Sequence, residues 1–189
     1  MPVQKVTREQ IVETSTLVFQ EKGYHKTSMG DLAEASGLLK GSLYHYFKSK
    51  EDLMIEVLDK FYNTFKKRAI EIIENDNLKS SQKLNKLINL SEEEYANNEH
   101  GSLMGNIVLE CMNVVPEFVE RIKQFFKEWI EMTSSVLQEW YKKDAAVKIA
   151  KDAIASIEGA VMMMTIFNDK TYLKRVHERL RRMVQAEIT

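Results

Sequence analysis

The chain is poor in three residue types on which other classes of protein depend. Its 189 residues include one Cys, two Pro and seven Gly. A single Cys excludes an intramolecular disulfide and is typical of proteins that work in a reducing compartment. Because Pro and Gly are scarce and the apolar residues mostly recur at helical spacing, we predict an all-α chain.

Long apolar runs are missing as well. No stretch approaches the roughly 18 apolar residues that a membrane-spanning helix needs, and residues 1–8 contain no apolar signal core. We therefore expect a cytoplasmic protein without a membrane partner. What remains is an ordinary globular composition, 44% hydrophobic and 29% charged, which is sufficient to bury a core.

Sequence patterns for catalysis and for metal binding are also absent. The four His are scattered, and Cys111 has no second Cys with which it could hold zinc. The chain has no Gly-Lys phosphate loop and no Gly-x-Ser-x-Gly elbow. We predict a protein that is not an enzyme, with no catalytic residues, no metal site and no cofactor.

Residues 24–53 have the pattern of a helix, a short bend and a second helix. Ala33, Gly37 and Leu43 have the spacing of a helix-turn-helix. A small residue lets the second helix cross closely, Gly permits a left-handed bend, and an apolar residue holds the second helix to the core. The outer face of that helix carries Lys40, Ser42, Tyr44 and His45.

The charge of this region supports a nucleic-acid partner. The whole chain has a net charge of −1, but the distribution of charge matters more than its sum. Residues 35–50 contain Lys40, Lys48 and Lys50 and no acidic residue. A solvated charged surface would give the same lysines; the helix-turn-helix spacing favours a DNA-binding face.

The same stretch resembles the DNA-binding domain of the TetR (tetracycline-repressor) family. The matching residues are Gly23-Tyr24, Thr27-Ser28-Met29, Asp31-Leu32-Ala33-Glu34-Ala35, Gly37, Lys40-Gly41-Ser42-Leu43-Tyr44-His45-Tyr46-Phe47 and Ser49-Lys50-Glu51. The resemblance implies an all-α fold of about nine helices, in which a long fourth helix joins a three-helix DNA-binding domain to a C-terminal domain for ligand binding and dimerisation. We place these domains at residues 1–50 and 51–189.

The resemblance also implies which residues touch DNA. It assigns contacts to Thr27, Lys40, Ser42, Tyr44, His45 and Lys50. To these we add Gly41, which allows the backbone to approach closely, and Lys48 from the basic set. In one departure, Leu39 occupies the position where the family usually has a Ser or Thr cap, which loses about 1 kcal/mol of helix stability.

The C-terminal region combines adaptable Met side chains with rigid aromatic rings, which either line a pocket for an apolar ligand or simply form the core. The resemblance places an effector pocket here. The side chains that we expect to line it are Phe61, Phe65, Tyr95, Met104, Ile107, Val108, Cys111, Phe125, Trp129 and Met162. Tyr95 and Glu110 are candidates for polar groups that orient a ligand, and the alternative for each is a surface position.

Turn-type residues divide this region into helices expected at about 80–98, 102–113, 116–143, 144–167 and 171–187. On the helix at 144–167, Ala155 and Gly159 form a strip of small residues. With Met163 they are our candidates for a dimer interface. Ordinary helix packing within one chain is the alternative.

These observations predict a DNA-binding regulator. We expect a repressor that binds a palindromic double-stranded DNA operator as a homodimer and is released by a small, largely apolar effector. The alternative is a non-inducible DNA-binding protein whose C-terminal domain serves only dimerisation or protein docking. A cavity in that domain favours the first function, and a solid core with an exposed apolar patch favours the second.

Overall fold

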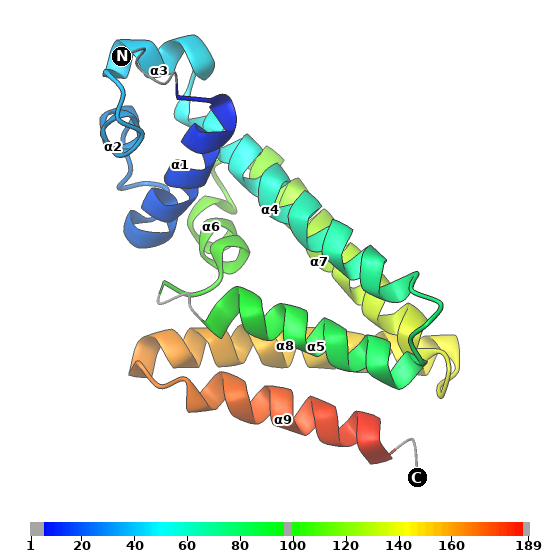
Figure 1. Cartoon of the computed structure of the whole chain (residues 1–189). Coiled ribbons are helices and arrows are strands. Elements are labelled where there is room, and N and C mark those ends of the chain that lie inside the picture. Colours follow the sequence, from blue (N-terminus) through cyan, green and yellow to red (C-terminus); the bar gives the residue numbers. More distant parts are fainter. Residues whose placement is uncertain (1–5, 97–99, 187–189) are drawn as a thin grey trace, which may run out of the picture. The chain divides into compact units, whose positions relative to one another are not determined.

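The computed structural model describes residues 6–96 and 100–186, and all regular structure within them is α-helical (Figure 1). This confirms the all-α prediction. The nine helices of the described residues are α1 (Arg8–Lys22), α2 (Met29–Ala35), α3 (Lys40–Tyr46), α4 (Lys50–Ile73), α5 (Ser80–Ala96), α6 (Leu103–Cys111), α7 (Pro116–Leu137), α8 (Lys143–Phe167) and α9 (Thr171–Ala186).

α1 and α2 both begin with a capping box, in which the side chains of the N-cap residue and of the third helical residue each accept the backbone N–H of the other. Thr7 and Gln10 cap α1 in this way, and Ser28 and Asp31 cap α2. Leu39, the N-cap residue of α3, makes no side-chain capping bond. The stability of α3 therefore depends more on tertiary packing than on capping of its N-terminus.

The chain forms two compact units. Residues 1–63 and 103–122 make the N-terminal unit, and residues 64–102 and 123–189 make the C-terminal unit. α4 and α7 contribute residues to both. These units group the chain by contacts, whereas our boundary after residue 50 concerns function and stays a prediction.

In the N-terminal unit, α2 packs against both α1 and α3. Phe19, Leu32, Leu43 and Phe47 are at most 1% exposed and form the core between these helices. The chain bends between α2 and α3 at Gly37, whose φ of +66° is a left-handed value that favours glycine. The helix-turn-helix geometry thus follows from the spacing of small and apolar residues.

In the C-terminal unit, α9 packs against both α5 and α8 (Figure 1). α7 ends at Leu137, so our prediction that this helix continues to residue 143 is wrong. The N–H groups of Trp140 and Tyr141 both bond to the carbonyl oxygen of Leu137 at 3.1 Å, which closes a turn. No described helix is long and apolar enough to cross a membrane.

Candidate nucleic-acid interface and ligand pocket

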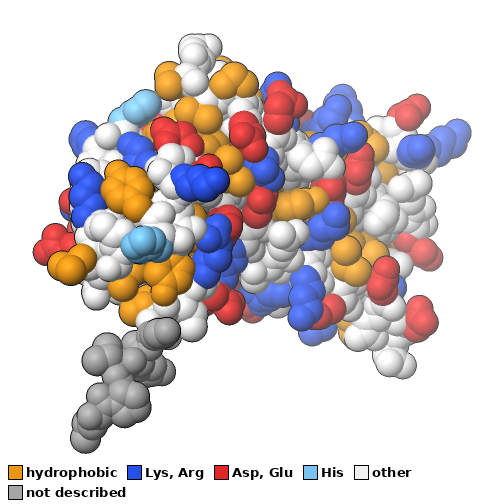
Figure 2. Space-filling view, turned by 90° about the horizontal axis from the view of Figure 1, so that it is seen from above, with side chains coloured by type: hydrophobic (Ala, Val, Ile, Leu, Met, Phe, Trp, Pro, Cys, Tyr) orange, Lys and Arg blue, Asp and Glu red, His pale blue; other side chains and the backbone are white. Residues whose placement is uncertain are grey.

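The outer face of α3 presents most of the predicted DNA-contact residues. Leu43 is fully buried and holds the inner face of the helix, whereas Lys40, Tyr44 and His45 are exposed. Figure 2 is seen from the side of α3 and shows Lys or Arg and His side chains beside exposed hydrophobic ones. Such a face can donate hydrogen bonds to phosphates and base edges and can contact thymine methyl groups.

Gly41 in α3 has no structural reason within the chain to be glycine. A Cβ atom built at this position meets no atom within 4 Å. Glycine within a helix costs roughly 1 kcal/mol relative to alanine, so its use here suits close approach of another molecule to the backbone. Ser42, the neighbouring residue, is half-buried.

Two predicted contact residues, Thr27 and Lys50, are instead held inside the turn between α1 and α2. Thr27 is 2% exposed, and its hydroxyl donates to the carbonyl oxygen of Gly23 at 2.6 Å. The Lys50 ammonium donates to the carbonyl oxygens of Tyr24 at 2.8 Å and of Thr27 at 2.9 Å. It also lies 4.1 Å from the centroid of the Tyr24 ring. Both side chains stabilise the turn, and DNA contact by either stays a prediction.

This arrangement predicts different results for Lys48 and Lys50. Lys48 is exposed, so Lys48→Gln should weaken binding to every DNA sequence and reduce the slope of log affinity against log salt by about one. Lys50→Gln should lower the free energy of unfolding by about 1.5–3 kcal/mol, because it removes a charged donor from two carbonyl oxygens. Salt-dependent DNA titration and urea unfolding separate the effects. Equal unfolding free energies for the two variants would contradict the assignment.

Arg8, a residue that the sequence analysis did not single out, fixes the end of α3. Its guanidinium donates to the carbonyl oxygen of Tyr46 and to the carboxylate of Glu56, and lies 4.0 Å from the centroid of the Phe47 ring. The periodic apolar pattern of α1 carries no signal for these contacts, which join residues 38 and 48 positions apart.

α6 binds the turn between α1 and α2. One Glu110 carboxylate oxygen accepts the backbone N–H of His25 at 3.1 Å, and the His25 ring Nε2 lies 3.0 Å from the Glu110 carbonyl oxygen. Phe118 of α7 packs edge-on against Tyr24, with ring centroids 5.2 Å apart. Glu110, which we considered as a group that orients a ligand, thus contacts the DNA-binding region of its own unit.

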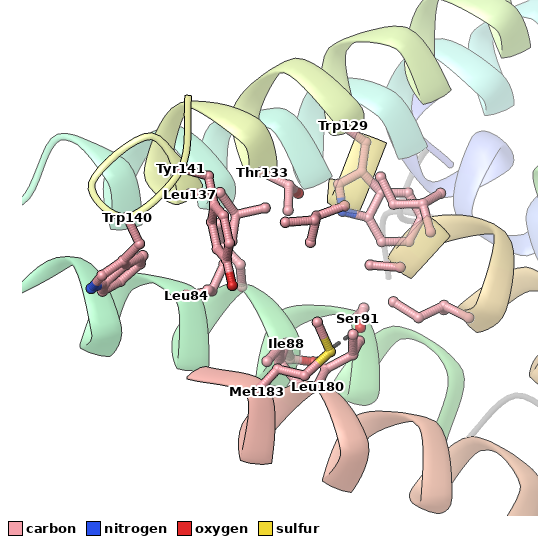
Figure 3. Close-up of a pocket in the computed structure, with 15 residues that line it drawn as sticks. Leu84, Ile88, Ser91, Trp129, Thr133, Leu137, Trp140, Tyr141, Leu180 and Met183 are labelled. Carbon is pink, nitrogen blue, oxygen red and sulfur yellow. Dashed lines mark hydrogen bonds between the residues drawn. The ribbon is translucent and has the colours of Figure 1, made fainter. Parts of the chain in front are cut away.

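A pocket lies within the C-terminal unit, among α5, α7, α8, α9 and the turn after α7 (Figure 3). Its volume is about 60 Å³, and none of its fifteen described lining residues is charged. The hydroxyl groups of Ser91, Thr133 and Tyr141 and the indole N–H groups of Trp129 and Trp140 supply its polar side-chain groups. Pockets for drug-sized ligands have roughly 300–1,000 Å³, so this one has to widen before it can hold a large molecule.

The protein is similar in sequence to a known family along most of its length. Residues 11–57 match the family model for bacterial regulatory proteins of the tetR family. Residues 81–179 match the model for the C-terminal domain of LmrA/YxaF-like transcriptional regulators. The chain belongs to the TetR family. This family consists of DNA-binding transcription regulators and not of enzymes, which confirms the prediction that the chain is not an enzyme.

Individual relatives match over nearly the whole chain. The HTH-type transcriptional regulator YxaF of Bacillus subtilis is 26% identical, and the alignment covers 96% of each chain. The HTH-type transcriptional repressor DhaR of a Mycobacterium species is 26% identical over 84% of this chain and 82% of its own.

Solved structures of other transcriptional regulators share the fold. A regulator from Legionella pneumophila superposes with a TM-score of 0.86 at 24% identity, over 97% of this chain and 99% of that one. The regulator FadR of Bacillus subtilis, solved in complex with stearoyl-CoA, superposes with a TM-score of 0.73 at 21% identity, over 94% of this chain and 97% of its own.

Of the ten side chains that we predicted to line the effector pocket of this TetR-family regulator, Trp129 alone lines the pocket found here. Phe65, Tyr95, Phe125 and Met162 belong to the same unit but do not line it. Phe61, Met104, Ile107, Val108 and Cys111 belong to the N-terminal unit. Contact between these nine residues and a ligand stays a prediction that this pocket does not support.

Burial gives three of these residues a structural role. Met104, Ile107 and Cys111 are at most 1% exposed, so their apolar character serves the core of the N-terminal unit. Burial also raises the pKa of the Cys111 thiol to about 11, which keeps it protonated and unreactive at neutral pH. The sequence feature that could have indicated the pocket is the apolar face of α5, because Leu84 and Ile88 on this face line it.

The residues predicted for a dimer interface lie on a largely exposed face of α8. Ala155 and Gly159 are exposed, Met163 is half-buried, and a Cβ atom built on Gly159 meets no atom within 4 Å. Met162 and Ile166, 55% and 62% exposed, continue the row at helical spacing. We call Ala155, Gly159, Met162 and Ile166 the α8 stripe.

Proposed function

We propose that this TetR-family regulator is a ligand-responsive repressor. It binds a palindromic operator in the cytoplasm as a homodimer and leaves the operator when a small, largely apolar effector enters the pocket of the C-terminal unit. The DNA-binding part of the proposal rests on the outer face of α3. Lys40, Tyr44 and His45 are exposed on this face, and a Cβ atom built at Gly41 meets no atom of another described segment within 4 Å.

The α8 stripe supports the homodimer. An exposed row of small and apolar residues on one helix suits burial against a second copy, since a two-fold axis brings the same surface together twice. Two helix-turn-helix regions held in this way would read half-sites about 34–36 Å apart. Repression, as the direction of regulation, is supported by the relative DhaR, which is named as a repressor.

The uncharged pocket supports a small apolar effector, and the structure of the relative FadR with stearoyl-CoA shows that a protein of this fold binds a ligand with an acyl chain. Trp129 lines the pocket, and its ring centroid lies 5.0 Å from that of Phe65 in α4. Because α4 contributes to both units, a ligand that displaces Trp129 can favour one arrangement of α4. It shifts the population of DNA-binding dimers only by its difference in affinity for the two arrangements.

Selection of bound genomic fragments, followed by titration of the recovered operator, tests the DNA-binding part. Lys40→Ala and Tyr44→Ala should each weaken operator binding by about 1–3 kcal/mol, because each removes a contact to a base or phosphate. Lys86→Ala, which removes an exposed Lys from α5, is the matched control and should bind like the wild type. Unchanged operator affinity in both α3 variants, with helical content preserved, would rule out α3 as the recognition helix.

The small volume of the pocket is the observation that favours the alternative, a non-inducible DNA-binding protein. A thermal-shift screen over a metabolite and drug library distinguishes the two functions. A ligand that raises the melting temperature and releases operator DNA supports the repressor. Stable operator binding with no stabilising compound supports the alternative.

A further inference from the structure

A buried polar pair lies beside the pocket of the C-terminal unit. Ser91 of α5 is 1% exposed and lines the pocket, and His177 of α9 is fully buried. The imidazole Nε2 lies 2.8 Å from the Ser91 hydroxyl oxygen. In Figure 3, Ser91 lies near Leu180 and Met183, with its hydrogen bond to the carbonyl oxygen of Ile88 drawn as a dashed line.

The hydrogen bonds of this pair are incomplete. Burial lowers the pKa of His177, so at neutral pH the ring is uncharged and carries one N–H and one bare nitrogen. If the Ser91 hydroxyl donates to Ile88, the imidazole donates from Nε2 and Nδ1 is the bare nitrogen. Nδ1 has no hydrogen-bond partner within the described part of the chain.

In that arrangement Ser91 keeps one lone pair for a further donor. In the other tautomer, the Ser91 hydroxyl donates to Nε2, which releases the Ile88 carbonyl and moves the ring proton to Nδ1. The pair can therefore change its donor and acceptor pattern without a change of charge. Nearby charges are already paired, since Arg181 donates to the carboxylate of Glu92 and to the amide oxygen of Asn89 at 2.8 Å.

The rest of the pocket sets the charge of a suitable ligand. None of the fifteen described lining residues carries a charge, so an ion within the pocket would be buried without a partner. Burial of an unpaired ion costs several kcal/mol, whereas a neutral polar group needs only one or two hydrogen bonds. Ser91 provides such a bond at the boundary between α5 and α9.

We infer that the pocket takes a neutral, mainly apolar ligand with a single hydrogen-bonding group, which Ser91 binds while His177 positions the Ser91 hydroxyl. This inference rests on the proposed effector pocket and adds the chemical class of the effector. His177 is a positioning residue, since it acts through Ser91.

The protein contains its own reporter for this test. The chain has two Trp residues, and both, Trp129 and Trp140, line the pocket. Intrinsic tryptophan fluorescence therefore reports occupancy without a label. Benzyl alcohol, toluene, benzoate and benzylammonium are suitable probes, because they share a ring and differ in hydrogen bonding and charge.

Benzyl alcohol and toluene should change the fluorescence saturably, and both ions should bind at least about tenfold more weakly because their charge has no partner in the pocket. Ser91→Ala should weaken benzyl alcohol binding by about tenfold and leave toluene binding within about twofold. His177→Leu should also reduce the ratio of the affinity for benzyl alcohol to the affinity for toluene. His177→Gln should restore part of this ratio, because an amide N–H can donate to Ser91. Ser135→Ala, the same change on the exposed side of α7, is the control.

The ratio of the two affinities separates hydrogen bonding from general damage to the fold. Equal weakening of both neutral probes by Ser91→Ala, tight binding of either ion, or absence of saturable binding by benzyl alcohol would overturn the inference. Operator capture by the wild-type protein is measured separately and without these probes. Its failure would instead count against the proposed function.

Discussion

Replacement of Ile166 by Lys is expected to produce monomers and to lower operator affinity by about 10²–10⁴-fold. Ile166 is 62% exposed within the α8 stripe, and a two-fold axis would bring two introduced ammonium groups into one apolar interface. Loss of the second DNA-binding region removes the gain from bivalent binding, which has this magnitude. Light scattering measures the molar mass, and titration with a full operator measures the affinity.

Leu17→Lys is a matched control for this experiment. Leu17 is 66% exposed on α1, so the substitution places the same charge at an equally exposed apolar position outside the α8 stripe. A second variant, Gly159→Leu, adds bulk where a Cβ atom meets nothing in the protomer, so any loss of assembly has to come from the partner copy. Dimers of normal affinity in both α8 variants would remove the stripe from the interface.

Phe65→Ala is expected to lower the free energy of unfolding by about 3–5 kcal/mol. Phe65 is 5% exposed, and its ring lies edge-on to Phe125 and Trp129, with centroid distances of 5.3 Å and 5.0 Å. Truncation leaves a cavity at the contact between α4 and α7 and removes two aromatic contacts. Urea unfolding followed by tryptophan fluorescence observes this contact directly, since Trp129 is one of the partners.

Tyr44→Ala is the control for the stability measurement, because it removes a ring from a site that is 46% exposed. Its unfolding free energy should stay within about 0.5 kcal/mol of the wild type. A loss below about 1 kcal/mol for Phe65→Ala would mean that α4 and α7 are not held together through this ring.

The fold of the DNA-binding region could be predicted because its determinants are local. The capping boxes of α1 and α2 each lie within four consecutive residues, and the bend at Gly37 is indicated by its spacing from Ala33 and Leu43. The end of α7 could not be predicted in this way. Residues 138–143 contain no Pro or Gly, and the side chains of Trp140 and Tyr141, in the turn that ends the helix, line a pocket with residues of other helices.

The exposed face of α3 was likewise predictable, since helical periodicity separates Leu43 from Lys40 and Tyr44. The pocket was not predictable, because its lining comes from four helices and a turn, and the periodicity within any one helix does not specify how these segments pack together. Met104, Ile107 and Cys111 on α6 were predicted to line a cavity, and their burial places them in a core. The contacts of Lys50 were not predictable either, because the sequence around it does not reveal that two backbone carbonyl oxygens accept hydrogen bonds from its ammonium group.

The contacts of α6 with the first turn of the chain limit how this regulator can be recombined with its relatives. A DNA-binding segment cut after residue 50 would lose Phe118 from the side of Tyr24 and would lose the carboxylate that accepts the N–H of His25. A chimera that exchanges operator specificity should therefore carry residues 103–122 together with residues 1–63, as a discontinuous module. Exchange of exposed α3 side chains alone avoids the problem, because Lys40, Tyr44 and His45 can change while the buried contacts of Leu43 and Phe47 remain.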